Sequence, residues 1–271
     1  MNTLIKVINT INPQTVKANQ NNPFTTTMPS LEHVTERYAF ISTAQFIQDV
    51  QSFGYTLDRT SAPRRGLGMH SMTFSHADMP KIDGLEMRFL ATNSHNGTSA
   101  FRLYIQILVQ VCSNGLVAWQ SKENAKVIHR GYALDKVQDA LTLVRSQFDS
   151  TLQTVEQMKQ RDVSPESGAE FLKQAVELRD ARPFAVIDLQ RVQHREQTEN
   201  NAWNVFNRVQ ESVIRGGYRT VEQAQYDMPR QGIVKGQNIP GRKARELTAI
   251  RDKVNVNTKL WQIAVETLLK A

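Results

Sequence analysis

The chain has 271 residues, a formal net charge of +7 and a pI of about 9.6, a balance that favours polyanionic partners. No apolar run reaches the roughly 18 residues that a membrane-spanning helix needs, and the N-terminus lacks the layout of a signal peptide. A lone cysteine, Cys112, excludes an internal disulfide and is typical of a reducing cytoplasm. We therefore expect a cytoplasmic protein that does not engage a membrane.

The N-terminal stretch 1–36 is rich in Asn, Thr, Gln and Pro and has little periodicity, which predicts a flexible arm. Residues 37–271 are predicted to form a single α+β domain. Its first helix follows a cap at Ser42 or Thr43 and runs through 44–53, with Gly54 as its stop.

Two alternating runs lie at the centre of the chain. Apolar residues occupy every second position in 85–91 and again from Phe101 to Val111, which indicates strands with one buried face. Between them, Asn96-Gly97 accepts positive φ and predicts a turn. We expect an antiparallel sheet within 67–130, in a sheet-rich part that covers 37–131.

The period changes after Asp135, where apolar residues recur at spacings of three and four. This predicts one long helix over 135–160, followed by a helix that Ser164 caps, one over 198–215 and one over 254–269. The fold class is therefore α+β, with the antiparallel sheet in the N-terminal half and a helical C-terminal part over 132–271.

Two basic segments contain glycine and proline and have an excess of positive charge. The first is a predicted turn over 59–66, and the second is a predicted long loop over 218–246. Lysine and arginine can neutralise phosphates, and tyrosine rings can stack on bases. The candidate nucleic-acid-binding residues are Arg59, Arg64, Arg65, Tyr218, Arg219, Tyr226, Arg230, Lys235, Arg242, Lys243 and Arg245.

Residues suited to catalysis are present but scattered. The six histidines form no pair with metal-ligand spacing on a helix, and there is no phosphate loop, dinucleotide fingerprint or nucleophile elbow. Asn93, Ser94, His95 and Asn96 are first turn formers, although a turn that meets a ligand at the rim of the sheet is the alternative. We expect no catalytic residue, no metal and no cofactor.

Cys112 has His95 and His129 in neighbouring stretches, yet it ends an alternating strand, where a cysteine is commonly a small packing residue. We expect Cys112→Ser to leave any binding activity intact and to lower the free energy of unfolding by about 1–2 kcal/mol if the sulfur is buried. Complete loss of function in a folded Cys112→Ser protein would reopen the hypothesis of a thiol enzyme. A binding assay beside a denaturation curve distinguishes the two results.

Several stretches resemble a phage and plasmid protein family that is catalogued as domain of unknown function 932. They are Asn93–Leu103, Val111–Leu116 and His129–Gly131, with further similarity at Tyr38–Thr43, Ala202–Asn207 and Gln210–Gly217. The resemblance covers most of 37–265 and implies a mobile-element origin and the cytoplasm of a host bacterium. It supplies no catalytic residues.

Taken together, these features predict a phage or plasmid protein that binds single-stranded DNA without strong sequence preference. A single strand is favoured over a duplex because the sequence has no groove-reading motif. The protein would act in viral DNA replication, recombination or transcription. Two alternatives stay open. One is a protein-recruitment factor, for example a cofactor of a phage RNA polymerase, and the other is an enzyme with its site on the central sheet. Self-association into a homo-oligomer also stays open.

Overall fold

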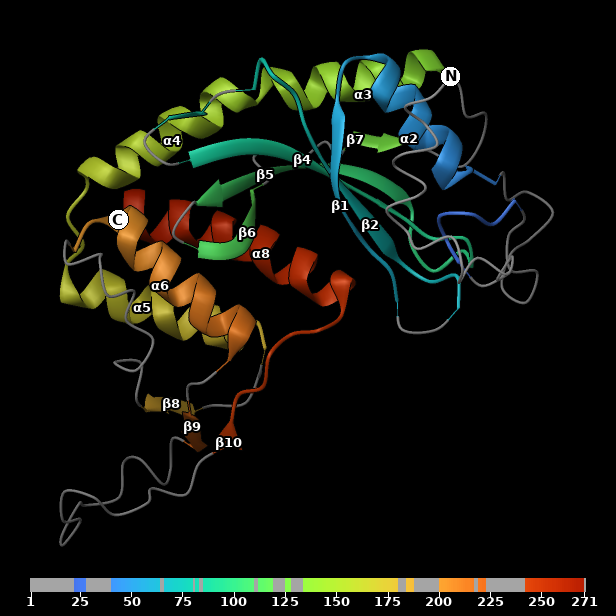
Figure 1. The fold of residues 1–271 in the computed structure, drawn as a ribbon. Coiled ribbons are helices and arrows are strands. Elements are labelled where there is room, and N and C mark those ends of the chain that lie inside the picture. The colour runs from blue at the N-terminus through green and yellow to red at the C-terminus, as the bar shows by residue number, and fades with distance from the viewer. Residues whose placement is uncertain are drawn as a thin grey trace, which may run out of the picture. The chain divides into compact units, whose positions relative to one another are not determined.

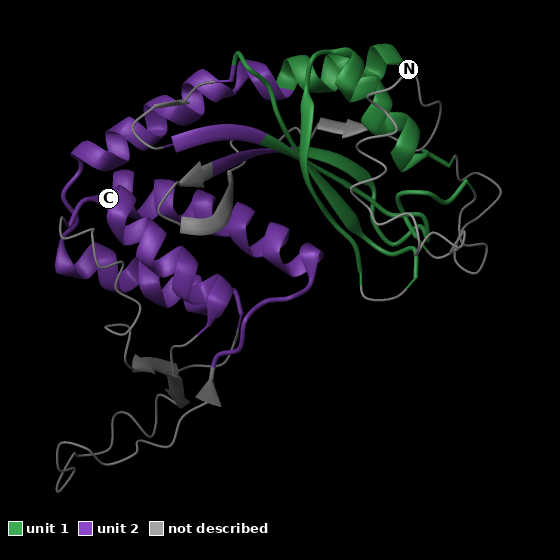
Figure 2. Cartoon of the chain, in the orientation of Figure 1, with its two compact units in different colours: residues 1–78, 89–103, 124–143 green, residues 79–88, 104–123, 144–271 purple. Residues whose placement is uncertain are grey.

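The computed structural model has the predicted α+β fold, with an antiparallel sheet in the N-terminal half followed by helices (Figure 1). The chain divides into two compact units, residues 1–78, 89–103 and 124–143 and residues 79–88, 104–123 and 144–271 (Figure 2). One domain from residue 37 onward, preceded by a flexible arm, stays a prediction. The structure describes residues 22–27, 40–63, 66–79, 81–82, 85–109, 112–118, 125–127, 134–179, 184–187, 200–216, 219–222 and 242–270.

The main sheet has the strand order β1 (Thr56–Ser61), β2 (His70–Ser75), β4 (Leu85–Asn93), β5 (Phe101–Val109) and β6 (Cys112–Ala118). The short strands β3 (Lys81–Ile82) and β7 (Ala125–Val127) pair with β4 and β5. The alternating runs around 85–91 and 101–111 therefore form strands, as predicted. The predicted basic turn begins later than expected, because β1 pairs with β2 through Arg59 and on to Ser61.

One face of this sheet forms the core of the first unit together with helix α2 (Thr43–Ser52). The ring of Phe46 on α2 lies 6.0 Å from that of Phe74 and 4.5 Å from that of Phe101. Phe74 and Phe89, on neighbouring strands, stack at 4.8 Å. We call this apolar side of the sheet the first face.

Helix α2 confirms its predicted start and stop. The Ser42 hydroxyl accepts a hydrogen bond from the Gln45 amide at 3.2 Å, so Ser42 is the cap and Thr43 begins the helix. Gly54 follows the last turn with φ of 85°, a conformation that glycine adopts without a steric penalty.

The helix predicted over 135–160 is interrupted, since α3 (Leu134–Ser146) ends before α4 (Phe148–Gln160) begins. At the break, the Gln147 amide donates to the Val144 carbonyl three residues back, at 3.2 Å. The hydroxyls of Ser150 and Thr151 both donate to the Gln147 carbonyl, at 3.0 and 2.8 Å. Such side chains compete for backbone acceptors and bend helices. The apolar stripe predicted the buried side correctly but could not reveal the break.

In the second unit, α6 (Ala202–Arg215) is almost entirely buried and contacts α4, α5 (Pro165–Glu177) and α8 (Ile250–Ala264). The π-helical turn η3 (Val265–Leu269) contacts α4, α5 and α8. The Phe206 ring on α6 lies 6.2 Å from Phe171 and 5.6 Å from Trp261. Ser164 caps α5 as predicted. No helix in the described part of the chain is long and apolar enough to span a membrane.

A second, three-stranded sheet has the order β10 (Arg242–Lys243), β9 (Arg219–Glu222) and β8 (Phe184–Ile187). The stretch 218–246, predicted as a loop, thus has strands near both ends, because its basic residues pair through their backbones. Residues 223–241 lie outside the described part. Strand β8 was not predicted, although its residues form a short apolar run after Pro183.

Candidate functional site

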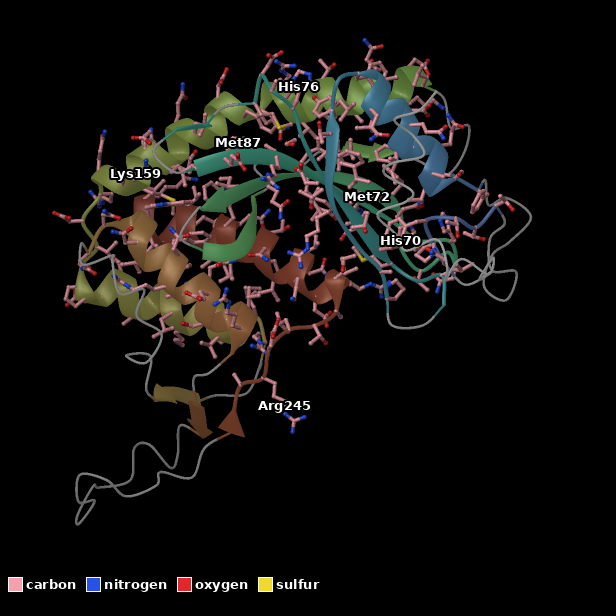
Figure 3. The ribbon with its side chains drawn as sticks, in the orientation of Figure 1. His70, Met72, His76, Met87, Lys159 and Arg245 are labelled. Carbon is pink, nitrogen blue, oxygen red and sulfur yellow. The ribbon has the colours of Figure 1, made fainter. Side chains whose placement is uncertain are left out.

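The structure describes five of the predicted nucleic-acid-binding residues, in two different units. Arg59 is an exposed residue of β1 in the first unit. In the second unit, Arg219 lies in β9, and Arg242 and Lys243 form β10. Arg245 follows β10 and is exposed, and Figure 3 shows its side chain projecting away from the backbone. The predicted residues outside the described part are Arg64, Arg65, Tyr218, Tyr226, Arg230 and Lys235.

The strands β9 and β10, together with Arg245, are here named the basic ribbon. In its antiparallel ladder, Lys243 is the direct partner of Arg219, and Arg242 is the direct partner of Thr220. Directly opposed positions lie about 5 Å apart, and like charges there are destabilising. The ladder therefore places two cationic residue types at directly opposed positions.

The base of the basic ribbon is fixed to the end of α6 by several contacts. The Arg179 guanidinium donates to the carbonyls of Val213 and Arg245, both at 2.6 Å. The Leu247 amide donates to the Ile214 carbonyl at 2.8 Å. Gly216 has φ of 75°, and a Cβ there would stand 2.4 Å from the Ala244 carbonyl oxygen. The chain thus leaves the ribbon in a defined position against the helical unit.

The first unit contains a different polar group, which we name the histidine cluster: Thr43, His70, Asn93 and His95, all completely buried. The Thr43 Oγ1 atom lies 2.7 Å from His70 Nε2 and 2.9 Å from His95 Nε2. Asn93 Nδ2 donates to the Ile41 carbonyl at 3.2 Å and reaches Thr43 Oγ1 at 3.3 Å. One hydroxyl at the first position of α2 therefore joins three buried side chains from β2, β4 and the turn after β4.

The hydrogen-bond partners determine the tautomer of each ring. His70 Nδ1 lies 3.0 Å from the Gly68 carbonyl, which can only accept, so His70 carries its proton on Nδ1 and accepts the Thr43 hydroxyl proton on Nε2. His95 Nε2 lies 2.8 Å from the Pro23 carbonyl and must donate. The same N–H is shared with Thr43 Oγ1. Each bond to the Thr43 hydroxyl thus has one donor and one acceptor when His70 is neutral.

Burial lowers the pKa of His70 from 6.5 to about 4, while its bond to the Gly68 carbonyl opposes the shift and the nearby His95 adds to it. A neutral, fully hydrogen-bonded imidazole without exposure to solvent cannot exchange protons with a substrate. The histidine cluster is therefore suited to holding α2, β2 and the turn after β4 together. Two further rings pack here: Phe24, from the N-terminal stretch, lies 5.3 Å from His70, and Phe40 lies 4.7 Å from His95.

The turn after β4 forms as its residue types predict. Asn93 Oδ1 accepts from the Ser94 amide at 2.8 Å, and Asn96 Oδ1 accepts from the Thr98 amide at 3.3 Å. Gly97 has φ of 70°. Asn93, Ser94 and His95 are buried rather than at a solvent-facing rim, so a ligand at the rim is not supported for these three residues.

Sequence reasoning missed the contacts that join distant segments. Thr43 and His70 are 27 residues apart, and nothing in their local patterns indicates that they meet. Nothing in the sequence around Arg179, just after α5, indicated that its side chain bonds to the carbonyls of Val213 and Arg245 at the base of the basic ribbon. Among the described residues, no group of three or more histidine, cysteine or carboxylate side chains could hold a metal ion. The prediction for the Cys112 side chain lies outside the described part.

Comparison with known proteins assigns the chain to a family. The model of a family described as a domain of unknown function (DUF932) matches residues 30–261, so the chain belongs to that family, as its sequence signature indicated. The UPF0380 proteins YfjQ and YafZ of Escherichia coli (strain K12) are each 25% identical, over 249 and 250 residues. Each alignment covers 88% of this chain and 85% of the relative. No solved structure matches the chain significantly.

Proposed function

We propose that this protein binds single-stranded DNA through its basic ribbon, without strong preference for base sequence. It acts in replication, recombination or transcription of a phage or plasmid, in the cytoplasm of the host bacterium. The net charge of +7 supports a polyanionic partner. It also supports an association that counterion release from phosphates drives.

The observation that carries the proposal is the direct pairing of Arg219 with Lys243. Two cations at opposed positions repel each other, and a phosphate between them turns that repulsion into two attractive contacts. Arg242 and the exposed Arg245 extend the positive charge along the same few residues. The bonds from Arg179 support a ribbon that is held ready for a ligand.

Single-stranded DNA suits the basic ribbon better as a ligand than the major groove of a duplex does. The described β9–β10 ladder has only two residue pairs, which is short for a two-stranded ribbon lying along a major groove. Phosphate contacts are independent of sequence, and Tyr218 and Tyr226 add aromatic faces on which bases of any kind can stack. Arg59, Arg64 and Arg65 of the other basic segment are proposed as further phosphate contacts.

Replacing Arg242 and Lys243 together by alanine tests the ribbon. Each lost phosphate contact should lower the slope of log affinity against log salt by about 0.7, so the double variant should lose about 1.4. If the two proteins bind equally at about 1 M salt, where phosphate contacts are screened, the double variant should bind roughly 25-fold more weakly at about 0.1 M salt. The loss should be the same for all base sequences. Fluorescence anisotropy with labelled oligonucleotides at several salt concentrations measures both quantities.

The matched control replaces Lys136 and Lys173, two exposed lysines on α3 and α5, by alanine. This control removes the same charge and should change affinity far less. Removing Lys243 also relieves its repulsion with Arg219, so the ribbon variant should be at least as stable as the parent. Equal weakening by ribbon and control variants would reduce the interaction to a diffuse charge effect. Unchanged binding by the ribbon variant would favour a role in recruiting a polymerase.

A further inference from the structure

The second face of the main sheet carries a line of hydroxyl groups within the first unit. In the strand register, Ser61 of β1 is opposite Ser71 of β2, and Ser71 is opposite Thr92 of β4. The neighbouring positions Thr60, Met72 and Ala91 pair in the same way and lie on the first face. We name Ser61, Ser71 and Thr92 the hydroxyl row.

Arginines flank the hydroxyl row on the same face. Arg59 is opposite Thr73 in the next row, on the edge strand β1, and its side chain is exposed. Arg102 follows Phe101, whose ring contacts Phe46 on the first face, so alternation puts Arg102 on the second. β5 is the neighbour of β4 in the sheet, so Arg102 lies on the strand beside Thr92.

On the part of this face that belongs to the first unit, two polar side-chain atoms have unused hydrogen-bonding capacity. Thr92 is completely buried, and in the described part of the chain its Oγ1 atom has no hydrogen-bond partner. Arg102 Nε is also buried and has no partner there. A buried polar group without a partner is destabilising, and an ion or an ordered water is one of the ways in which folded proteins satisfy such a group.

We propose that the hydroxyl row, with Arg59 and Arg102, binds a phosphate group. A phosphate accepts hydrogen bonds on every oxygen, matches hydroxyl and guanidinium donors, and takes the positive charge of the arginines. The row runs from the exposed Ser61 at the sheet edge to the buried Ser71 and Thr92. The site goes beyond the basic ribbon, since it lies in the other unit and stands even if the ribbon binds nothing.

The phosphate can belong to a free nucleotide or to a nucleic-acid strand. Titrating the full chain with inorganic phosphate, dTMP and an oligothymidylate without terminal phosphate distinguishes the two sources. Acetate at equal ionic strength is the control for general anion effects. Binding of phosphate and dTMP but not of the oligonucleotide assigns the site to a nucleotide. Binding of the oligonucleotide that depends on Thr92 assigns it to a strand.

Thr92→Val is the decisive variant, because valine keeps the shape and removes only the hydroxyl. We expect phosphate binding, measured by calorimetry, to weaken about ten- to a hundredfold, as for a lost hydrogen bond to a charged group. Without ligand, the melting temperature should stay equal or rise, since no internal bond is lost. Thr60→Val, on the first face of β1, is the control and should bind like the parent. Arg102→Gln should weaken binding similarly.

The result that overturns the proposal is equally specific. Thr92→Val that binds as the parent does, a parent that binds no phosphate in any of the three forms, or equal binding of acetate would each remove the site. A loss of binding that accompanies a lower melting temperature without ligand would show that the Thr92 hydroxyl supports the fold instead. Loss of binding in ribbon variants alone would leave this site untouched.

Discussion

Replacing Thr43 by valine is expected to lower the free energy of unfolding by about 3 kcal/mol, although the two side chains have the same shape. The Thr43 hydroxyl is the donor at 2.7 Å to His70 Nε2 and the acceptor for His95 and Asn93. His95 keeps the Pro23 carbonyl, and Asn93 keeps the Ile41 carbonyl. The variant therefore leaves the buried His70 Nε2 without its donor. His95 and Asn93 each lose one of their two acceptors, the Thr43 hydroxyl. Chemical denaturation measures the loss.

Thr142→Val is the matched control, because Thr142 is an exposed helix residue whose hydroxyl donates only locally, to the Gln138 carbonyl at 2.9 Å. Its free energy of unfolding should change by no more than about 0.5 kcal/mol. If Thr43→Val were as stable as this control, the histidine cluster would not be holding α2 against the sheet.

Acidification is expected to remove about 3 kcal/mol of stability through His70 alone. Its pKa is lowered from 6.5 to about 4 in the fold, so the unfolded chain binds the proton more tightly than the folded chain between these values. The contribution of His70 to the free energy of unfolding is therefore fully present above about pH 6.5. It decreases as the pH falls from about 6.5 to about 4, and it changes little below about pH 4. The measurement is the free energy of unfolding of the parent at several pH values.

His70→Gln separates this contribution from that of the carboxylates, because glutamine does not titrate. Between about pH 7 and pH 4, the variant should lose about 3 kcal/mol less than the parent. His76→Gln, at a histidine outside the cluster, should retain most of the parent's pH dependence. Parallel curves for His70→Gln and the parent would mean that His70 is not held neutral by burial.

Alternation and capping predicted most of the local structure. The period of two around 85–91 and 101–111 predicted the strands β4 and β5 correctly. The prediction of a single buried face was incomplete, because Leu90, Thr92 and Tyr104 on the opposite face are buried as well. Ser42 and Ser164 cap helices as their residue type predicts. The break at Gln147 was not predictable, because no glycine or proline marks it and the apolar stripe continues across it from Val144 to Phe148.

The candidate sites were less accessible to sequence reasoning. Charge excess identified the segment of the basic ribbon, but strand pairing, which no local pattern encodes, decides that Lys243 is opposite Arg219. The motif that begins at Asn93 predicted a turn correctly. Its histidine meets Thr43, 52 residues away, and that contact follows from the topology of the sheet and α2.

The most direct test of the proposed function is titration of labelled single-stranded and double-stranded oligonucleotides with the unmodified protein over a range of salt concentrations. We expect tighter binding to the single strand, similar affinity for different base sequences, and an affinity that falls steeply as salt rises. Absence of binding at low salt, or an affinity that does not respond to salt, would show that the basic ribbon does not recognise phosphates.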